Sequence, residues 1–242
     1  MREDVLLDNP IWSALSTEHA SLARGDEQAR RYPPDIGPLS GIPYQSRESY
    51  DALRFLAGSG VVVLFSVDPL RIPSEWKTIR EGPIVQMIRT PATFAAAGAP
   101  DLRLDAQKLR VEEGILLRQL SAADAPAMVA LAELTEPGPF RQRTIELGNF
   151  YGILHRGRLL AMSGKRMHLP GLVEVSGVCT HPDARGRGYA AHLMSLVIAE
   201  IEEEGKIPFL HAFADNPAIR LYQRLGFELR QNFNFAVIAP QA

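Results

Sequence analysis

The pattern of apolar and polar positions changes character near residue 110. Before that point, prolines interrupt residues 30–44, leucines at helical spacing predict a short helix at 47–60, and an apolar run predicts a buried strand at 61–67. A loosely structured connector is expected at 90–105. After that point, strand-like and helix-like segments alternate. Strands are predicted at 114–121, in two runs within 149–167, and at 172–180, 207–214 and 228–239, with helices at 125–134, 189–205 and 216–227.

The order of these elements predicts two parts, an accessory α/β domain at 1–110 and an α/β domain at 111–242. The strand at 61–67 has too few partners to stand alone, and large apolar residues are interleaved with the prolines of 30–44. We therefore expect the accessory domain to pack against the second domain and to help wall a pocket there, without an activity of its own. A degenerate first copy of the second domain is an alternative, because Asp68-Pro69 follows a strand.

Composition and charge narrow the classes of protein that the chain can represent. Hydrophobic residues make up 46% of the chain and charged residues 22%, which is typical of a globular protein. A net charge of −2 gives no reason to expect nucleic acid as a partner. No apolar run approaches the roughly 18 residues needed to span a bilayer, and the acidic start lacks the apolar core of a signal peptide. One cysteine, Cys179, is typical of a reducing cytoplasm, and the six histidines show no spacing typical of a zinc site. We expect a cytoplasmic protein without a metal.

The stretch "HPDARGRGYAAH" at 181–192 joins a predicted strand to a predicted helix and carries two glycines and two arginines. Most helices begin with a capping Ser, Thr, Asp or Asn, and this one has none. Glycines let the backbone approach a ligand closely, and the unpaired N–H groups at a helix start suit a phosphate. Arginine side chains add positive charge. The turn therefore predicts a phosphate or pyrophosphate site, with a tight turn and solvated arginines as the alternative.

A dinucleotide-binding fingerprint is formally met by "GRGYAA" at 186–191, with Asp215 ending the next strand. That fingerprint opens a domain and is followed by several further strand–helix units. Only 27 residues follow Asp215, and residues 181–184 separate the glycines from the end of the strand. The dinucleotide interpretation is therefore disfavoured.

Residues 113–238 resemble the GNAT superfamily of acetyl-coenzyme-A-dependent N-acetyltransferases. The signature of that family, [Q/R]-x-x-G-x-[G/A], is met from Arg185 to Ala190. A second family segment, in which an asparagine after a strand precedes a helix ending in Tyr-x-x-x-Gly-Phe, is met by Asn216 and by Tyr222 to Phe227. The resemblance implies a mixed central sheet flanked by helices, and acetyl-coenzyme A (acetyl-CoA) as cosubstrate.

The resemblance also implies a role for each matching position. The backbone of Val178, Cys179 and Thr180 pairs with the pantetheine arm, and Gly177 suits a bulge that opens this strand. Asn216 contacts the same arm, and Tyr222 protonates the departing thiolate. The backbone amides that hold the pyrophosphate belong to Arg185, Gly186, Arg187, Gly188, Tyr189 and Ala190.

A catalytic base is needed because an amine attacks a thioester only when its nitrogen is neutral. Glu174 is the one charge within the predicted strand 172–180, and some GNAT members carry a glutamate eleven residues before the signature. It precedes Val178 by four residues, about 13 Å along a strand, so a water relay is a possible link. A structural ion pair is the alternative for Glu174, a helix cap for Asn216 and a core aromatic for Tyr222. Cys179 is interpreted as a small buried hydrophobe rather than a nucleophile.

These residues together predict an N-acetyltransferase that moves an acetyl group directly from acetyl-CoA to an amine of a small molecule or a protein. A non-catalytic acyl-CoA-binding sensor or scaffold is the alternative, and the presence of both Glu174 and Tyr222 favours the enzyme. The loop at 137–148 is expected to border the acceptor pocket, where Arg141 and Arg143 either meet an anionic group or remain solvated.

Overall fold

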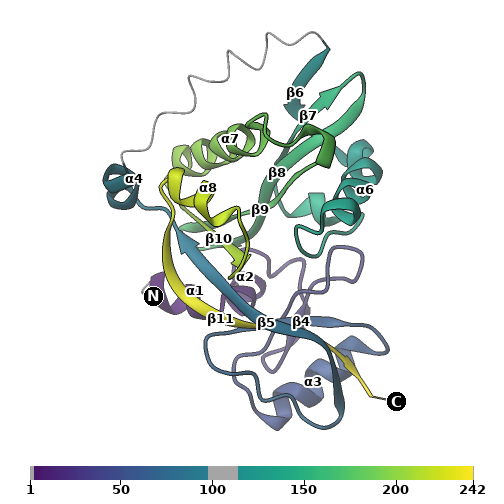
Figure 1. Ribbon diagram of the computed structural model, residues 1–242. Helices are drawn as coiled ribbons and strands as arrows, with labels where there is room; N and C mark the ends of the chain where they lie inside the picture. The colour runs from purple at the N-terminus through teal and green to yellow at the C-terminus, as the bar shows by residue number, and fades with distance from the viewer. Residues whose placement is uncertain (1–2, 98–113, 242) are drawn as a thin grey trace.

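The computed structural model describes residues 3–97 and 114–241, and its centre is an eight-stranded sheet (Figure 1). The strand order is β4-β11-β5-β10-β9-β8-β7-β6. Only β9 and β10 are parallel among these neighbours, and the other pairs are antiparallel. The strands are β4 (Val62–Ser66), β5 (Trp76–Ile88), β6 (Ile115–Gln119), β7 (Phe150–His155), β8 (Arg158–Leu169), β9 (Leu172–Thr180), β10 (Ile207–Phe213) and β11 (Glu228–Pro240). The expected mixed sheet flanked by helices is confirmed.

Helices cover both faces of the sheet. On one face, α7 (Tyr189–Glu203) and α8 (Ile219–Arg224) pack on β9 and β10 through an apolar cluster that includes Val173, Val197 and Leu210. On the opposite face, α6 (Ala125–Thr135) packs on β7 and β8, and α1 (Glu3–Asp8) and α2 (Pro10–Ser16) pack on β8 to β10. None of the helices within 3–97 and 114–241 has both the length and the apolar character needed to cross a membrane.

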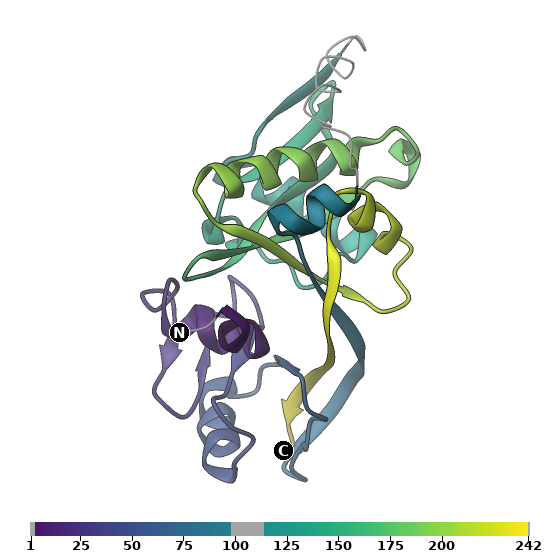
Figure 2. The ribbon, with the colours of Figure 1, turned by 90° about the vertical axis from the view of Figure 1, so that its left-hand side faces the viewer.

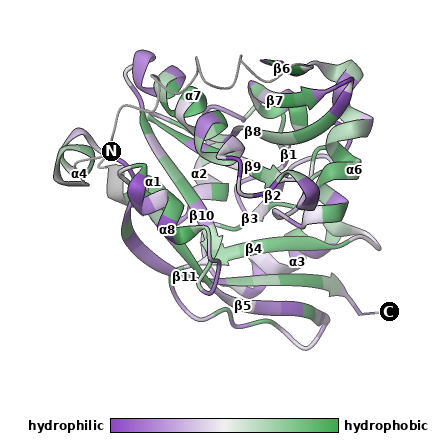
Figure 3. Cartoon of the chain, turned by 45° about the horizontal axis from the view of Figure 1, so that its top comes forward, coloured by the Kyte–Doolittle hydropathy of each residue, from purple (hydrophilic) through white to green (hydrophobic). Residues whose placement is uncertain are grey.

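The strands of the central sheet differ in hydropathy. Figure 3 shows hydrophobic residues along β4 and β7, whereas β5 and β11 also carry hydrophilic stretches.

Further elements lie outside the central sheet and the helices that cover it. The other elements are a small sheet of β1 (Arg24–Gly25), β2 (Arg30–Arg31) and β3 (Ser40–Gly41), the helices α3 (Arg47–Ala57) and α4 (Pro91–Ala97), and single 3-10 turns at Ala122–Asp124, Thr144–Leu147 and Pro182–Ala184.

The sheet crosses the boundary expected at residue 110. Strand β5 from the first part lies between β10 and β11, with Ile84 opposite Phe213, while the end of β11 pairs with β4, with Val237 opposite Val63. Figure 2 shows these two long strands running side by side between the upper and lower parts of the molecule. Each part therefore contributes a strand to the other. The division at 110 stays a prediction, and a cut there would separate hydrogen-bonded strands.

Residues 30–44 wrap against the sheet as expected, because their apolar side chains are buried. Tyr32, Ile36, Leu39 and Ile42 lie in the core, whereas Tyr44 is 78% exposed. The largest apolar cluster joins these residues from the first part to Met167, Leu172 and Phe209 from the second.

Most predicted elements of the second part are found close to their expected places. The helix predicted at 216–227 is shorter, at Ile219–Arg224, and the loop at 137–148 contains the 3-10 turn at Thr144–Leu147. In the first part, β5 and the helices α1 and α2 were not predicted. The connector expected at 90–105 begins with α4, and its positions 98–105 lie outside the described residues.

Candidate active site

Strands β9 and β10 diverge at the centre of the sheet. Their parallel pairing runs from Leu172–Ile207 to Glu174–Phe209, and both strands continue beyond it. On its other side β9 carries one extra residue against β8 between Ser176 and Cys179, and Gly177 there has a φ of +62°. A Cβ atom at Gly177 would lie 2.8 Å from the ring of Phe150. The bulge expected at Gly177 is confirmed, and it lies where the two strands separate.

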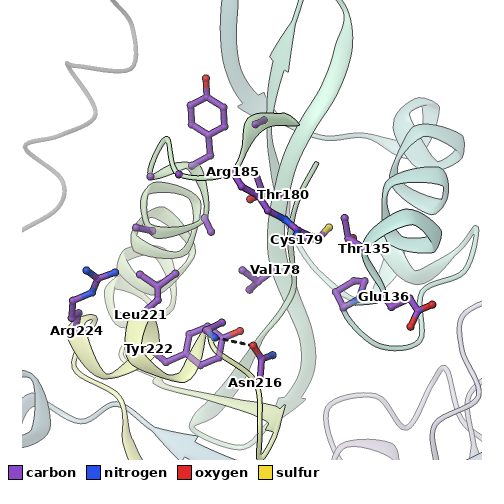
Figure 4. A pocket seen from close by; sticks show the side chains of 18 residues that line it. Thr135, Glu136, Val178, Cys179, Thr180, Arg185, Asn216, Leu221, Tyr222 and Arg224 are labelled. Atoms are coloured by element: carbon purple, nitrogen blue, oxygen red, sulfur yellow. Dashed lines mark hydrogen bonds between the residues drawn. The ribbon is translucent and has the colours of Figure 1, made fainter. Parts of the chain in front are cut away.

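A cleft of about 410 Å³ opens beside the diverging end of β9, and we call it the turn cleft (Figure 4). The strand end, the turn before α7, the first turn of α7 and one side of α8 line it. Ten of the twelve predicted site residues lie along this lining: Val178, Cys179, Thr180, Arg185, Gly186, Gly188, Tyr189, Ala190, Asn216 and Tyr222. Arg187 belongs to the same turn but does not line the cleft, and Glu174 lies deeper in the sheet.

The turn before α7 has the geometry that an anion-binding helix start requires. Gly186 and Gly188 have φ angles of +78° and +77°, which side-chain-bearing residues rarely adopt. Gly188 is the N-cap, so no side chain caps the first N–H groups of this 15-residue helix. The side chains of Arg185 and Arg187 are exposed beside it. The turn can therefore offer backbone amides, the positive end of a helix dipole and cationic side chains to a phosphate.

A smaller cavity of about 100 Å³ adjoins the turn cleft, and we call it the arginine cavity because Arg166 lines it. His211 also lines it, together with Phe65 and Ile84 from the first part of the chain. The turn cleft and the arginine cavity meet at five shared residues: Glu136, Pro137, Val178, Asn216 and Tyr222. A molecule bound in the turn cleft can therefore contact a molecule bound in the arginine cavity at Tyr222 and Asn216.

Tyr222 and Asn216 lie beside each other at this junction (Figure 4). Burial raises the pKa of the Tyr222 phenol to about 12, so its hydroxyl keeps its proton at neutral pH. The Oδ1 atom of Asn216 accepts a hydrogen bond of 2.8 Å from the backbone N–H of Ala218. Asn216 therefore orders the turn before α8, whose N-cap is Ala218.

Glu174 occupies a buried ion pair. Its two oxygens accept hydrogen bonds from Arg166, from Nε at 2.7 Å and Nη2 at 2.8 Å, and Oε1 also lies 2.8 Å from Nδ1 of His211. Burial alone would raise the pKa of Glu174, but the charge and hydrogen bonds of Arg166, with the His211 bond, lower it to about 2. The arrangement matches the structural ion pair weighed as the alternative. The role of Glu174 as base stays a prediction. A carboxylate with a pKa of about 2 is a weak proton acceptor at neutral pH, so the ion pair does not favour that role.

His211 is neutral in this arrangement. Its Nδ1–H donates to Glu174, and its Nε2 faces the Nε2 amide nitrogen of Gln86 at 3.0 Å, which requires Nε2 to act as acceptor. Burial, together with the charges of Arg166 and Arg230, lowers the pKa of His211 below its ordinary value, although the hydrogen bond and charge of Glu174 raise it. Gln86 is oriented in turn because its Oε1 accepts from Arg230 at 2.9 Å.

The sequence analysis did not find Arg166, His211 or Gln86. A signal existed for the first of them, because Arg166 belongs to the strand run predicted immediately before the strand that carries Glu174. Gln86 lies on β5, which was not predicted, and His211 stands among apolar residues of β10 without a pattern that marks it.

Cys179 lines the turn cleft as a buried thiol. Burial raises the pKa of Cys179 to about 12, so the sulfur remains protonated and a poor nucleophile at neutral pH. In the loop at 137–148, Pro137, Gly138 and Pro139 line the arginine cavity. Arg143 is paired instead with Asp35 at 2.9 Å and Glu146 at 2.7 Å. Within the described residues no three His, Cys, Asp or Glu side chains gather as a metal site.

Comparison with known proteins identifies the family. The model of the FR47-like protein family matches residues 150–236. A candidate acetyltransferase from the GNAT family of Novosphingobium aromaticivorans is 36% identical in sequence, with a TM-score of 0.79, and the match covers 98% of this chain and 99% of that one. The chain therefore belongs to the GNAT family of acetyltransferases.

Two further matches are more limited. A GCN5-related N-acetyltransferase from Kribbella flavida shares the fold at a TM-score of 0.64 and 16% identity, over 98% of this chain and 96% of that one. The mycothiol acetyltransferase of Brachybacterium faecium is 41% identical over 59 residues, which are 23% of this chain and only 18% of that protein.

Proposed function

We propose that the chain is an N-acetyltransferase that moves an acetyl group from acetyl-CoA directly to an amine. The observation that carries the proposal is the meeting of two spaces, the turn cleft and the arginine cavity, at Tyr222 and Asn216. Direct transfer requires such a junction, because the acceptor nitrogen and the thioester must come within bonding reach in one place.

The residues of the turn cleft fit acetyl-CoA. The backbone of Val178, Cys179 and Thr180 is the part of β9 that diverges from β10, and it can pair with the pantetheine amides. The uncapped turn from Arg185 to Ala190 is suited to the pyrophosphate, and Asn216 lies at the same end of the cleft as Tyr222. When bound, acetyl-CoA supplies an activated acetyl thioester.

The reaction forms a bond between the amine nitrogen and the acetyl carbon and breaks the bond between that carbon and sulfur. The acceptor ammonium loses one proton before attack, and the amide nitrogen loses a second when the product forms. We assign the proton that the departing thiolate receives to the hydroxyl of Tyr222, which is protonated at neutral pH. The second proton lost by the nitrogen restores that hydroxyl, and the first passes through the base to water. Glu174 is the proposed base, acting through water, because its oxygens already bind Arg166 and His211.

The test is a thiol-release assay with purified chain, acetyl-CoA and a panel of primary amines, with mass spectrometry of the products. We expect amine-dependent release of free thiol and an acceptor heavier by one acetyl group. Tight binding of acetyl-CoA without turnover on any amine would favour the alternative, a sensor or scaffold that binds the acyl donor.

A further inference from the structure

We propose that the acceptor is a small amine bearing a carboxylate, such as an amino acid, with its carboxylate held by Arg166 and its amine directed to Tyr222. This inference rests on the proposed function and names its substrate class. Three features of the arginine cavity support it: the position of Arg166 relative to Glu174, the place of the positive charge in the cavity, and the chemistry of its walls.

The ion pair of Arg166 and Glu174 presents its positive end to the cavity. Arg166 lines the cavity and Glu174 does not, and the Glu174 side chain is only 1% exposed against 9% for the Arg166 side chain. The guanidinium uses Nε and Nη2 for Glu174, and its Nη1 has no hydrogen-bond partner among the described residues. An arginine has five N–H donors in a fixed plane, so one guanidinium can bind two carboxylates.

The positive charge of the cavity lies where an amino acid with its amine at Tyr222 would place its carboxylate. Arg166 and His211 line the arginine cavity but not the turn cleft, so they lie away from the thioester. His211 contributes no charge, because its two ring nitrogens are fixed in a neutral form. Glu136, the other charged residue of the described lining, is exposed at the junction, and its carboxylate points away from Tyr222 and Asn216 (Figure 4). The charge that faces the deep end of the cavity is therefore positive, and a carboxylate is favoured there.

The walls between these ends are apolar. Phe65, Phe213 and Phe235 line the cavity together with Ile84 and Leu210. Few water molecules can compete for Arg166 in such surroundings, and a charge-assisted hydrogen bond is stronger there than in water. The walls also suit an apolar side chain on the acceptor.

The experiment compares kcat/KM for a panel of free amino acids, each tested beside its C-terminal amide. The amide differs by the lost carboxylate charge, and its amine is more easily deprotonated, so a disadvantage of the amide cannot come from amine basicity. We expect the best amino acid to exceed its amide by roughly 10- to 100-fold. Equal or better turnover of the amides would overturn the proposal while the proposed transferase function stands.

Two further measurements test whether the preference for the carboxylate arises at Arg166. The deaminated carboxylate of the best amino acid should inhibit competitively against the amine and not against acetyl-CoA, and failure to inhibit would count against the carboxylate site. In the Arg166→Gln/Glu174→Gln double variant, which removes both buried charges together, the preference for acid over amide should fall to within about threefold. Arg143→Gln, which changes an arginine paired with Asp35 and Glu146, should keep the preference.

The comparison of each amino acid with its amide on the wild-type chain tests the carboxylate preference even if the double variant does not fold. A chain that acetylates no amine in this panel or in the panel of primary amines, yet is stabilised against heat by the deaminated carboxylate, would overturn the proposed function and support the carboxylate site. A chain that acetylates no amine in either panel and is not stabilised would overturn both.

Discussion

Arg166 donates two hydrogen bonds to Glu174, from Nε at 2.7 Å and from Nη2 at 2.8 Å, across the neighbouring strands β8 and β9. Both side chains are almost wholly removed from solvent. Each charge therefore depends on the other, because an unpaired charge in this position would lose its hydration without compensation.

Replacing Glu174 by Gln should lower the free energy of unfolding by roughly 3–5 kcal/mol at pH 7, because Arg166 is left buried without a counter-charge. The folded pKa of about 2 lies below the ordinary value of 4.5, so the wild-type stabilisation is complete above about pH 4.5. It is lost as the pH falls toward 2. Denaturant unfolding of wild type and variant should therefore converge across that window. A difference that is independent of pH would contradict the ion-pair account.

The same variant tests the proposed base. If Glu174 removes the amine proton through water, kcat/KM of Glu174→Gln should fall most steeply near neutral pH. It should partly recover at high pH, where the amine deprotonates itself. The measurement is a pH–rate profile on one acceptor, at pH values where the variant remains folded. A profile parallel to that of the wild type would leave Glu174 with its structural role alone.

The signals that predicted β9 and α7 lie within their own residues. β9 was expected at 172–180 and is found at Leu172–Thr180, since a compact apolar run is enough to mark a buried strand. α7 was expected at 189–205 and is found at Tyr189–Glu203, because its glycine entry and its apolar face are both local. The same local motifs identified the lining of the turn cleft.

The missed features depend on residues that are far apart in sequence. β5 contains Gly82-Pro83, which is typical of a turn, and its partners β10 and β11 follow more than 100 residues later. The contact of Arg166 with Glu174 depends on register. β8 and β9 shift register between Lys165 and His168, so counting residues from the hairpin turn does not place these two side chains together.

Gly188→Glu should abolish the rise in melting temperature that acetyl-CoA gives the wild type. The substitution forces a side chain into a φ of +77° and places a negative charge where a pyrophosphate is expected. Gly171→Glu is a matched control, because Gly171 has the same φ, has open space around it and lies outside the turn cleft. Thermal melts with millimolar acetyl-CoA are the measurement. If acetyl-CoA left the wild-type melting curve unchanged, the assignment of the turn cleft as the acetyl-CoA site would be wrong.

Tyr222→Phe should lower kcat by roughly 10- to 1000-fold, because the variant lacks the proton that the hydroxyl donates to the thiolate. The acetyl-CoA-dependent thermal shift should change little, since the ring still fills its place. Tyr50→Phe is the control: burial also raises the pKa of Tyr50 to about 12, but Tyr50 lies in α3 outside both spaces. A kcat loss of similar size in both variants would indicate a general effect on packing instead of proton donation.

Phe65 tests whether the first part of the chain shapes the acceptor site. It lies on β4 and lines the arginine cavity, and its ring lies 5.0 Å from that of His211. Phe65→Ala removes an apolar wall, so KM for an apolar acceptor should rise by roughly tenfold, as expected for about 1–2 kcal/mol of lost burial. The thermal shift with acetyl-CoA should be unchanged. Phe55→Ala is the control, because Phe55 is 88% exposed on α3. If both variants kept the wild-type KM for every acceptor, residues 1–110 would not contribute to acceptor binding through this wall.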